Sequence, residues 1–267
     1  MRQKDFVRIV TERLQIEFEK QDRSGVYGLT QRMMAYNSNK IEGSTLTEEQ
    51  TASMFDTGTL YSDDPEVIFR AKDIEEMNGH FKMFNYMLKT LDEPLSEDVI
   101  KAFHKNLKEG VFEDFANGYA IGDYKKRRNR VSTIATSEPQ DVYNDMQALL
   151  DDYRANKRIG IPELAVFHAR FEKIHPFQDG NGRVGRMILL RECLVNGVIP
   201  VIIQDINKAE YYRNLLNVQT KNQVEGLIGY FKSEQEDYYR KAAPYVIDQD
   251  ELQKLDIGHL FVNSDPA

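Results

Sequence analysis

One stretch of twelve residues carries most of the chemistry that this sequence offers. It runs from His175 to Arg186 and reads HPFQDGNGRVGR. A histidine can take a proton from a hydroxyl group near neutral pH, and a carboxylate such as that of Asp179 is a hard ligand for Mg²⁺ on phosphates. Arg183 and Arg186, three residues apart on one helix face, suit a polyphosphate. The stretch therefore predicts transfer chemistry on a nucleotide, with His175 as the base.

Helical patterns on both sides of this stretch must position it. Residues 163–174, ELAVFHARFEKI, repeat apolar side chains at helical spacing, and a second apolar helix begins near Gly182. The apolar face of the second helix is wide, so we expect this helix near the centre of the domain. Gly180 and Gly182 permit a tight loop, and the free N–H groups that follow form an anion-binding site.

Each of these features also has a plain structural interpretation. A histidine near a helix end, a GNG turn and two arginines on one helix are all common in proteins without any role in catalysis. An unrelated loop would rarely carry all of them in this order. The combination therefore favours a functional site over ordinary helix packing.

The stretch resembles the Fic motif, HxFx(D/E)GNGRxxR, at every defined position, and it differs from the related Doc toxins, whose loop lacks GNGR. The resemblance implies an all-α, mostly helical Fic fold with one short β-hairpin flap. It also implies transfer of AMP from ATP to a Ser, Thr or Tyr hydroxyl of a protein. His175 would be the base, Asp179 would hold Mg²⁺, and Phe177 would anchor the loop in the core. The implied nucleotide contacts are Asp179, Gly180, Asn181, Gly182, Arg183, Val184, Gly185 and Arg186, with Arg186 nearest the γ-phosphate.

A second short pattern lies upstream, where residues 38–43 read SNKIEG. A helix over about 29–42 would place Glu42 at its C-terminal end, where the helix dipole disfavours a carboxylate. Taken alone, Glu42 is a surface glutamate. Beside the Fic motif, Ser38 and Glu42 resemble the inhibitory pattern (S/T)xxxE(G/N) of that family. The resemblance implies that Glu42 pairs with Arg186 in the place of the γ-phosphate.

Two further segments carry predicted contacts. Residues 131–134, Val131, Ser132, Thr133 and Ile134, are mostly β-branched and follow a basic run, which predicts a short strand or hairpin; a basic surface loop is the alternative. The resemblance implies a flap that holds the target by strand addition beside His175, with these residues near the nucleotide. It further implies that Tyr211 and Gln219 cover the adenine. The alternative for this pair is ordinary helix packing.

The spacing of apolar residues also predicts how the chain is organised. We expect an opening helix over 4–20 that Gly25 and Gly28 end, a long helix from Glu66, and a last helix over 225–245. The predicted helix caps are Thr47 with Gln50, Ser96, and Ser137 with Gln140. The predicted division is an N-terminal helical region with the inhibitory motif (1–92), a Fic core (93–235), and a helix end with an acidic tail (236–267).

Composition narrows the classes of partner. The 267 residues include 35 basic and 43 acidic ones, a net charge of −8 that argues against general nucleic-acid binding. No run of about 18 apolar residues exists, so no membrane span is expected. Cys193 is the single cysteine, which excludes an internal disulfide and fits a reducing compartment. We therefore expect a cytoplasmic protein, and a homo-oligomer is compatible with the sequence.

These inferences lead to one function and several alternatives. The prediction is a protein adenylyltransferase that uses ATP and Mg²⁺, modifies a protein target and itself, and is autoinhibited by Glu42. One alternative is removal of AMP from a modified protein, with Glu42 orienting a water molecule. A non-catalytic nucleotide-binding regulator would not need His175, and a helical scaffold would leave the two motif arginines unexplained. Transfer of phosphate or phosphocholine is also chemically open.

Overall fold

The computed structural model describes residues 2–131 and 134–247. Before the hairpin, the described chain is helical and largely amphipathic. Its helices are α1 (Gln3–Glu19), α2 (Val26–Ile41), α3 (Glu48–Thr57), α4 (Ala71–Lys89), α5 (Glu97–Lys108) and α6 (Phe112–Ala116). The predicted caps of α3 and α5 are confirmed, because Thr47 and Gln50 form a reciprocal capping box and the Ser96 hydroxyl accepts from the Val99 amide.

A short antiparallel hairpin and a second set of helices complete the described chain. Strands β1 (Arg130–Val131) and β2 (Ile134–Ala135) pair with Val131 opposite Ile134. The elements that follow are α7 (Val142–Arg154), α8 (Ile161–Ile174), α9 (Asn181–Val195), the 3-10 turn η1 (Asp205–Asn207), α10 (Lys208–Lys221) and α11 (Glu225–Val246). The predicted all-α fold with one hairpin is confirmed.

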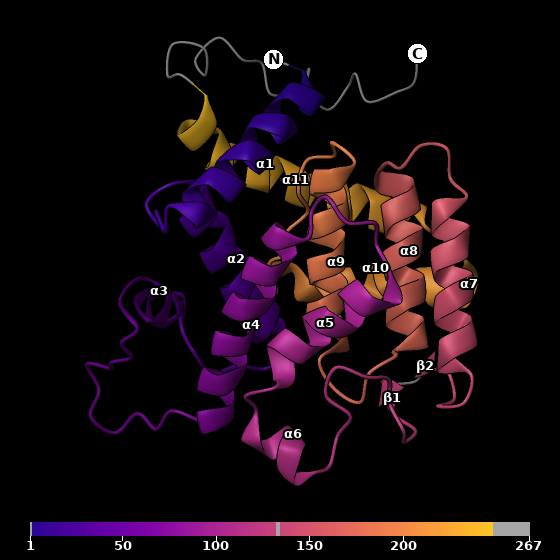
Figure 1. Ribbon diagram of the computed structural model, residues 1–267, viewed down its shortest axis with the longest axis horizontal. Helices are drawn as coiled ribbons and strands as arrows, with labels where there is room; N and C mark the ends of the chain where they lie inside the picture. Colours follow the sequence, from indigo (N-terminus) through magenta and orange to yellow (C-terminus); the bar gives the residue numbers. More distant parts are fainter. Residues whose placement is uncertain (1, 132–133, 248–267) are drawn as a thin grey trace.

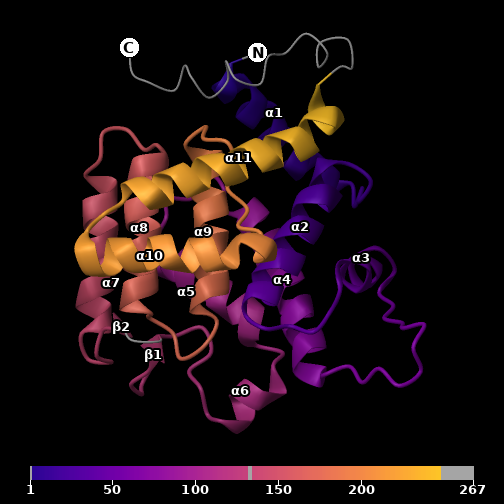
Figure 2. The same ribbon diagram turned by 180° about the vertical axis from the view of Figure 1, so that it is seen from behind.

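Helix α9 lies at the centre of the bundle, as its wide apolar face predicts (Figure 1). It contacts α8, α5, α4 and α2, and nearly all of its side chains are buried. Figure 2 shows α10 and α11 crossing the other side of the molecule, where both contact α8. The loop between α8 and α9 lies at the same end of the bundle as the hairpin.

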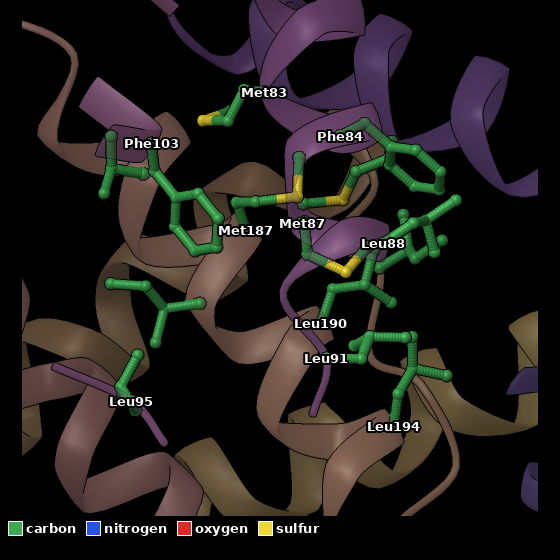
Figure 3. Packing of buried hydrophobic residues seen from close by; sticks show 14 of the residues in the cluster. Met83, Phe84, Met87, Leu88, Leu91, Leu95, Phe103, Met187, Leu190 and Leu194 are labelled. Atoms are coloured by element: carbon green, nitrogen blue, oxygen red, sulfur yellow. The ribbon is translucent and has the colours of Figure 1, made fainter. Parts of the chain in front are cut away.

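Methionines fill much of the space between α4 and α9. Met83 and Met87 of α4 face Met187 of α9, and Phe103 of α5 closes the cluster (Figure 3). These side chains are fully buried. Unbranched thioether chains fit irregular gaps well, which suits a core where three helices meet.

The approach of α4 to α5 depends on Gly79. A Cβ atom at this position would lie 2.0 Å from the backbone oxygen of Leu107. Only glycine permits this approach, because backbone cannot move aside as a flexible side chain can. The contact fixes the C-terminal end of α5, where Lys108 lies, against α4.

The N-terminus of α2 is capped by a side chain of α1. The buried Glu17 carboxylate accepts from the Tyr27 amide at 2.9 Å and pairs with Arg13 at 2.6 Å. The prediction that Gly28 ends a helix was wrong, because α2 begins at Val26 and includes Gly28. A Cβ on Gly28 would lie 1.9 Å from the Arg23 oxygen, so the glycine lets the preceding loop pass close to the helix.

Two other local predictions were also wrong. The helix expected from Glu66 begins at Ala71, and the Asp73 carboxylate in its first turn holds Arg70 and Thr45. Ser137 does not cap α7; its hydroxyl donates to Asp145 instead.

Among the helices of the described residues, none combines the length and the apolar character that crossing a bilayer requires.

Candidate active site

The loop between α8 and α9 is held by its own side chains. His175 ends α8 in the left-handed conformation (φ 53°), and Gly180 begins α9 at φ 81°. Phe177 is fully buried, as predicted. The Asn181 side chain closes the loop, because its oxygen accepts from the Phe177 amide at 2.7 Å and its nitrogen donates to the Phe177 carbonyl at 2.8 Å. The Asn181 side chain thus fixes the shape of the loop.

His175 is a neutral imidazole with a defined tautomer. Its Nδ1 lies 3.3 Å from the Glu172 carbonyl oxygen, which can only accept, so Nδ1 carries the proton and Nε2 is left as an acceptor. Burial lowers the pKa of His175 to about 4, with Lys125 adding to the effect. A neutral ring with a free Nε2 is the form that a general base requires.

The hairpin is bonded directly to this loop. The Lys125 amide donates to the Pro176 carbonyl at 2.8 Å, and Asn129 Nδ2 donates to the Phe177 carbonyl at 2.8 Å. The buried Lys125 ammonium donates to Asn129 Oδ1 and Thr136 Oγ1, which ties together the two arms of the hairpin. The hairpin therefore lies beside His175, as expected of a flap.

Of the four residues predicted on the flap, Val131 and Ile134 are paired in the two strands. Ser132 and Thr133 lie outside the described residues. The first part of the basic run is not a solvated surface, because Lys125 is buried against the catalytic loop. The remainder of the basic run, Lys126, Arg127 and Arg128, is exposed.

The second motif arginine is bound by the end of α2. Arg186 Nη2 lies 2.7 Å from Glu42 Oε1, and it also donates to the Ser38 carbonyl at 3.0 Å. Arg186 Nε donates to Ser38 Oγ at 2.9 Å. Burial alone would lower the pKa of Arg186, but the Glu42 carboxylate raises it above its usual value. The structure thus brings together the three residues of the predicted inhibitory contact.

The first motif arginine turns towards α4. Arg183 is buried and pairs with Glu76 at 2.6 Å, while Asp179 lies 3.5 Å away. Its Nη1 also donates to Asn39 Oδ1 at 3.3 Å. Arg183 and Arg186 therefore both contact helix α2, through Asn39 and Ser38 respectively.

Asp179 has a partner that the sequence analysis did not find. Lys108 Nζ lies 2.7 Å from Asp179 Oδ2, although 71 residues separate the two. Burial alone would raise the pKa of Asp179, but Arg183 and Lys108 hold it well below its usual value. The spacing of four between His104 and Lys108 on α5 was the available signal, since it places both on one helix face.

His104 supports the loop from the same face of α5. Its ring stacks on Phe177 with centroids 4.0 Å apart. The Gly122 amide donates to its Nδ1 at 2.9 Å, so Nε2 carries the proton and donates to the Asp179 carbonyl at 3.1 Å. His104 therefore holds the loop between α8 and α9 from the α5 side.

The remaining predicted contacts lie on α9 and α10. Val184 is buried and its amide donates to the Gly180 carbonyl at 3.1 Å, while Gly185 packs against Glu172 and Phe171. Tyr211 is buried with its hydroxyl 2.8 Å from His168 Nε2, and Gln219 Nε2 donates to the Ala169 carbonyl at 3.2 Å. Both α10 residues thus contact α8, and their role towards adenine stays a prediction.

The first turn of α9 leaves amides free for a ligand. The first intrahelical bond runs from Val184 N–H to the Gly180 carbonyl, so the N–H groups of Gly182 and Arg183 precede it. A Cβ on Gly182 would lie 2.3 Å from Glu42 Oε1 and 2.9 Å from Arg186 Nη1. The Glu42–Arg186 pair therefore lies against Gly182 in the first turn of α9.

A profile of the Fic/DOC family matches residues 94–193. The matched range holds the hairpin, the catalytic loop and most of α9. Residues 94–193 form a Fic domain. The Fic motif lies wholly within this range, whereas Glu42 and Ser38 lie outside it, on α2.

Curated relatives share the Fic domain at modest identity. The chain is 27% identical over 187 residues to the protein adenylyltransferase Fic of Nematostella vectensis, covering 67% of this chain and 41% of that protein. It is 26% identical over 187 residues to a probable protein adenylyltransferase of Aquifex aeolicus, covering 70% of this chain and 57% of that protein. The chain thus spans about half the length of these relatives.

Solved Fic structures share the fold. A Fic-domain signalling protein of Bacteroides thetaiotaomicron superposes with a TM-score of 0.69 at 22% identity, covering 92% of this chain and all of that one. Fic-1 of Caenorhabditis elegans superposes with a TM-score of 0.65 at 21% identity, covering 87% of this chain and 70% of that one. The likeness extends well beyond residues 94–193, so the N-terminal helices belong to the shared fold.

Proposed function

We propose that the chain is a protein adenylyltransferase that moves AMP from ATP to a hydroxyl group of a protein target, and that Glu42 restrains it. The observation that carries the proposal is the arrangement around the Fic motif. A neutral His175, a carboxylate, free helix amides and two arginines lie on one short loop and the helix turn after it. The names of the curated relatives support the same activity.

The nucleotide binds at the N-terminus of α9. The free amides of Gly182 and Arg183 point towards the phosphates, and the helix dipole favours negative charge there. Arg186 contacts the γ-phosphate once Glu42 has left it. Tyr211 and Gln219 remain the proposed residues on the adenine side.

The donor set near the α- and β-phosphates fits one Mg²⁺ ion. Both cationic contacts of Asp179 go to Oδ2, and among the described residues no cation contacts Oδ1. The Asp179 side chain is 37% exposed, so the carboxylate is accessible to a ligand. Mg²⁺ on phosphates commonly uses one or two protein carboxylates, and it would neutralise charge on the phosphates here.

His175 prepares the attacking hydroxyl group. The target chain adds to the edge of the hairpin, which is bonded to the loop through Lys125 and Asn129 and so presents its acceptor residue to His175 Nε2. The hydroxyl oxygen bonds to the α-phosphorus, its proton passes to Nε2, and the bond to the leaving pyrophosphate breaks. Catalysis is mainly positioning and charge stabilisation, since no site residue forms a covalent bond to the transferred AMP.

The inhibitory pair, Glu42 with Arg186, restrains this reaction. The carboxylate takes the guanidinium that the γ-phosphate would bind and lies against Gly182 in the first turn of α9. The pair places a negative charge where the polyphosphate must lie, so ATP cannot take its productive position. Removing the Glu42 side chain releases the site without altering the catalytic loop.

The test is transfer from α-labelled ATP with Mg²⁺, using wild type, Glu42→Gly and the double variant Glu42→Gly/His175→Ala. We expect weak self-labelling by wild type, strong labelling by Glu42→Gly and none by the double variant. If Glu42→Gly binds ATP but transfers no AMP to itself or to added protein, the adenylyltransferase proposal fails and a nucleotide-binding regulator takes its place. If both proteins label equally, the role of Glu42 is wrong.

A second assay separates transfer from removal of AMP. Only Oε1 of Glu42 contacts Arg186, so the second carboxylate oxygen is available to orient a water molecule. Protein labelled by Glu42→Gly is purified and incubated with wild type, and released AMP is measured. Release by wild type that Glu42→Gly and His175→Ala both lack would assign removal of AMP to the same site.

A further inference from the structure

The strongest unexplained feature of the molecule is a lysine without solvent contact. Lys108, the last residue of α5, is fully buried. A lysine is almost never fully buried unless carboxylates pair with it, since burial of a lone charge is costly. The reaction proposed above does not use it, although it contacts the motif carboxylate.

Three carboxylates surround the Lys108 ammonium. Nζ lies 2.6 Å from Glu76 on α4, 2.7 Å from Asp114 on α6 and 2.7 Å from Asp179 on the catalytic loop. Glu76 and Asp114 are themselves buried. The ammonium thus joins two rigid helices to the one carboxylate that is open to ligands.

The charges of this cluster nearly balance. With Arg183, which pairs with Glu76 and lies 3.5 Å from Asp179, two cations face three carboxylates. Without Lys108, one cation would face three carboxylates within a buried space. Such a set strongly favours the entry of another cation.

We propose that the Lys108 ammonium permanently occupies the cation position among these three carboxylates, beside the proposed metal ligand Asp179. It is a positioning residue that holds Asp179 through Oδ2 and keeps free metal ions out of the carboxylate cluster, so that a divalent ion enters only together with the nucleotide phosphates. This inference rests on the proposed role of Asp179 as metal ligand. It assigns to Lys108, Glu76 and Asp114 a function in metal selection.

The distances explain why an ammonium can take this place. Ca²⁺ binds oxygen at about 2.3–2.6 Å and Mg²⁺ at about 2.0–2.1 Å. Oxygens at 2.6–2.7 Å from Nζ therefore lie near Ca²⁺ distances and too far apart for Mg²⁺. Among the described residues, no group of three His, Cys, Asp or Glu side chains is arranged to hold a metal ion by itself.

The test uses nucleotide-free protein and metal alone. Lys108→Met removes the charge and keeps most of the side-chain volume. We expect a lower Tm than wild type, and a rise of roughly 3–10 °C on adding CaCl₂ at about ten to a hundred times Kd. The rise should be larger with Ca²⁺ than with Mg²⁺ and absent in Lys108→Met/Asp179→Asn. Wild type and Lys108→Arg should not respond.

Asp114→Asn is the matched control. It removes one contact of Lys108 and leaves the ammonium on Asp179, so its Tm should fall without any response to metal. An equal response of Asp114→Asn and Lys108→Met would show a general effect of destabilisation and would overturn the proposal. So would a folded Lys108→Met that no divalent ion stabilises.

A measurement on wild type decides the matter if Lys108→Met does not fold. The electron paramagnetic resonance signal of free Mn²⁺ should persist at full height when wild type is added without nucleotide. Mn²⁺ binding without nucleotide that Asp179→Asn abolishes would contradict the proposal. AMP transfer by Glu42→Gly is scored separately, so a failure here leaves the adenylyltransferase proposal untouched.

Discussion

Glu42 Oε1 lies 2.7 Å from Arg186 Nη2, across 144 residues of sequence. The carboxylate follows the last residue of α2, and the guanidinium projects from the second turn of α9. A bond between a carboxylate and a buried guanidinium is among the stronger polar contacts in proteins. Any ligand that needs Arg186 must therefore break it.

The first prediction concerns discrimination between ATP and ADP. Glu42→Gly should bind ATP about 10–100 times more tightly than wild type, because Arg186 then gains a phosphate contact worth about 1.5–3 kcal/mol. ADP lacks the γ-phosphate, so its affinity should change about twofold at most. Isothermal titration calorimetry on both nucleotides measures the difference. Glu66→Gly on an exposed loop is the control, and equal gains for ATP and ADP would contradict the assignment.

The second prediction concerns Ser38. Its hydroxyl accepts from Arg186 Nε at 2.9 Å, but the Ser38 carbonyl and Glu42 remain when the hydroxyl is removed. Ser38→Ala should therefore release the enzyme only in part and lower the free energy of unfolding by about 1–3 kcal/mol. Initial rates of self-labelling should fall between wild type and Glu42→Gly. Labelling as strong as that of Glu42→Gly would show that Ser38, and not the carboxylate, dominates.

The third prediction concerns stability at low pH. Burial lowers the pKa of His80, His104 and His168 to about 3. The unfolded chain takes up these protons near pH 6.5 and the folded protein does not, so stability is lost as pH falls below about 6.5. At pH 5 each histidine costs about 2 kcal/mol. Glu172 opposes them, because burial raises its pKa to about 7 and the folded protein gains a proton there first.

Urea unfolding at pH 7 and pH 5 measures this effect. We expect wild type to lose a few kcal/mol between the two, and His80→Leu to lose about 2 kcal/mol less. An unchanged pH dependence in His80→Leu would mean that His80 is protonated in the folded protein.

The fourth prediction compares two helical glycines. Gly79→Ala should lower the free energy of unfolding by about 2–4 kcal/mol, since its Cβ would meet backbone at 2.0 Å. Gly229→Ala on α11 has nothing within 4 Å and should raise it by about 0.5–1 kcal/mol. Chemical denaturation of both variants checks the pair. Two gains of similar size would show that helix propensity and not the close approach governs Gly79.

The sequence predicted the elements whose signals are local. The central α9, the hairpin and the caps at Thr47 and Ser96 each depend on neighbouring residues, and each is confirmed. The prediction for Gly28 was wrong because a glycine is needed there for a close contact with the Arg23 backbone, which no local pattern records. A glycine has two opposite meanings, a break or a close approach, and only packing distinguishes them.

The residues of the site likewise divide into those that local sequence predicts and those that it does not. The motif loop was readable because its residues are adjacent, and Glu42 was found only through the resemblance. Lys108 was missed because its carboxylates come from α4, α6 and the catalytic loop. The helix dipole favours a lysine at the C-terminal end of any helix, so the position of Lys108 in the sequence is also typical of a surface residue. Ion pairs between segments far apart in the chain produce no regular spacing of residues from which they could be predicted.

Helix α2 has a consequence for how fast the contact between Glu42 and Arg186 can open. Most of its residues are buried and it contacts α1, α3, α4, α9 and α11, so detaching it would expose the core. Glu42 lies just beyond its last turn, with a side chain that is 32% exposed. The carboxylate can therefore leave Arg186 by rotating its own bonds while the helix stays in place. Such rotations take picoseconds to nanoseconds, so the proposed release of Arg186 needs no slow rearrangement of the bundle.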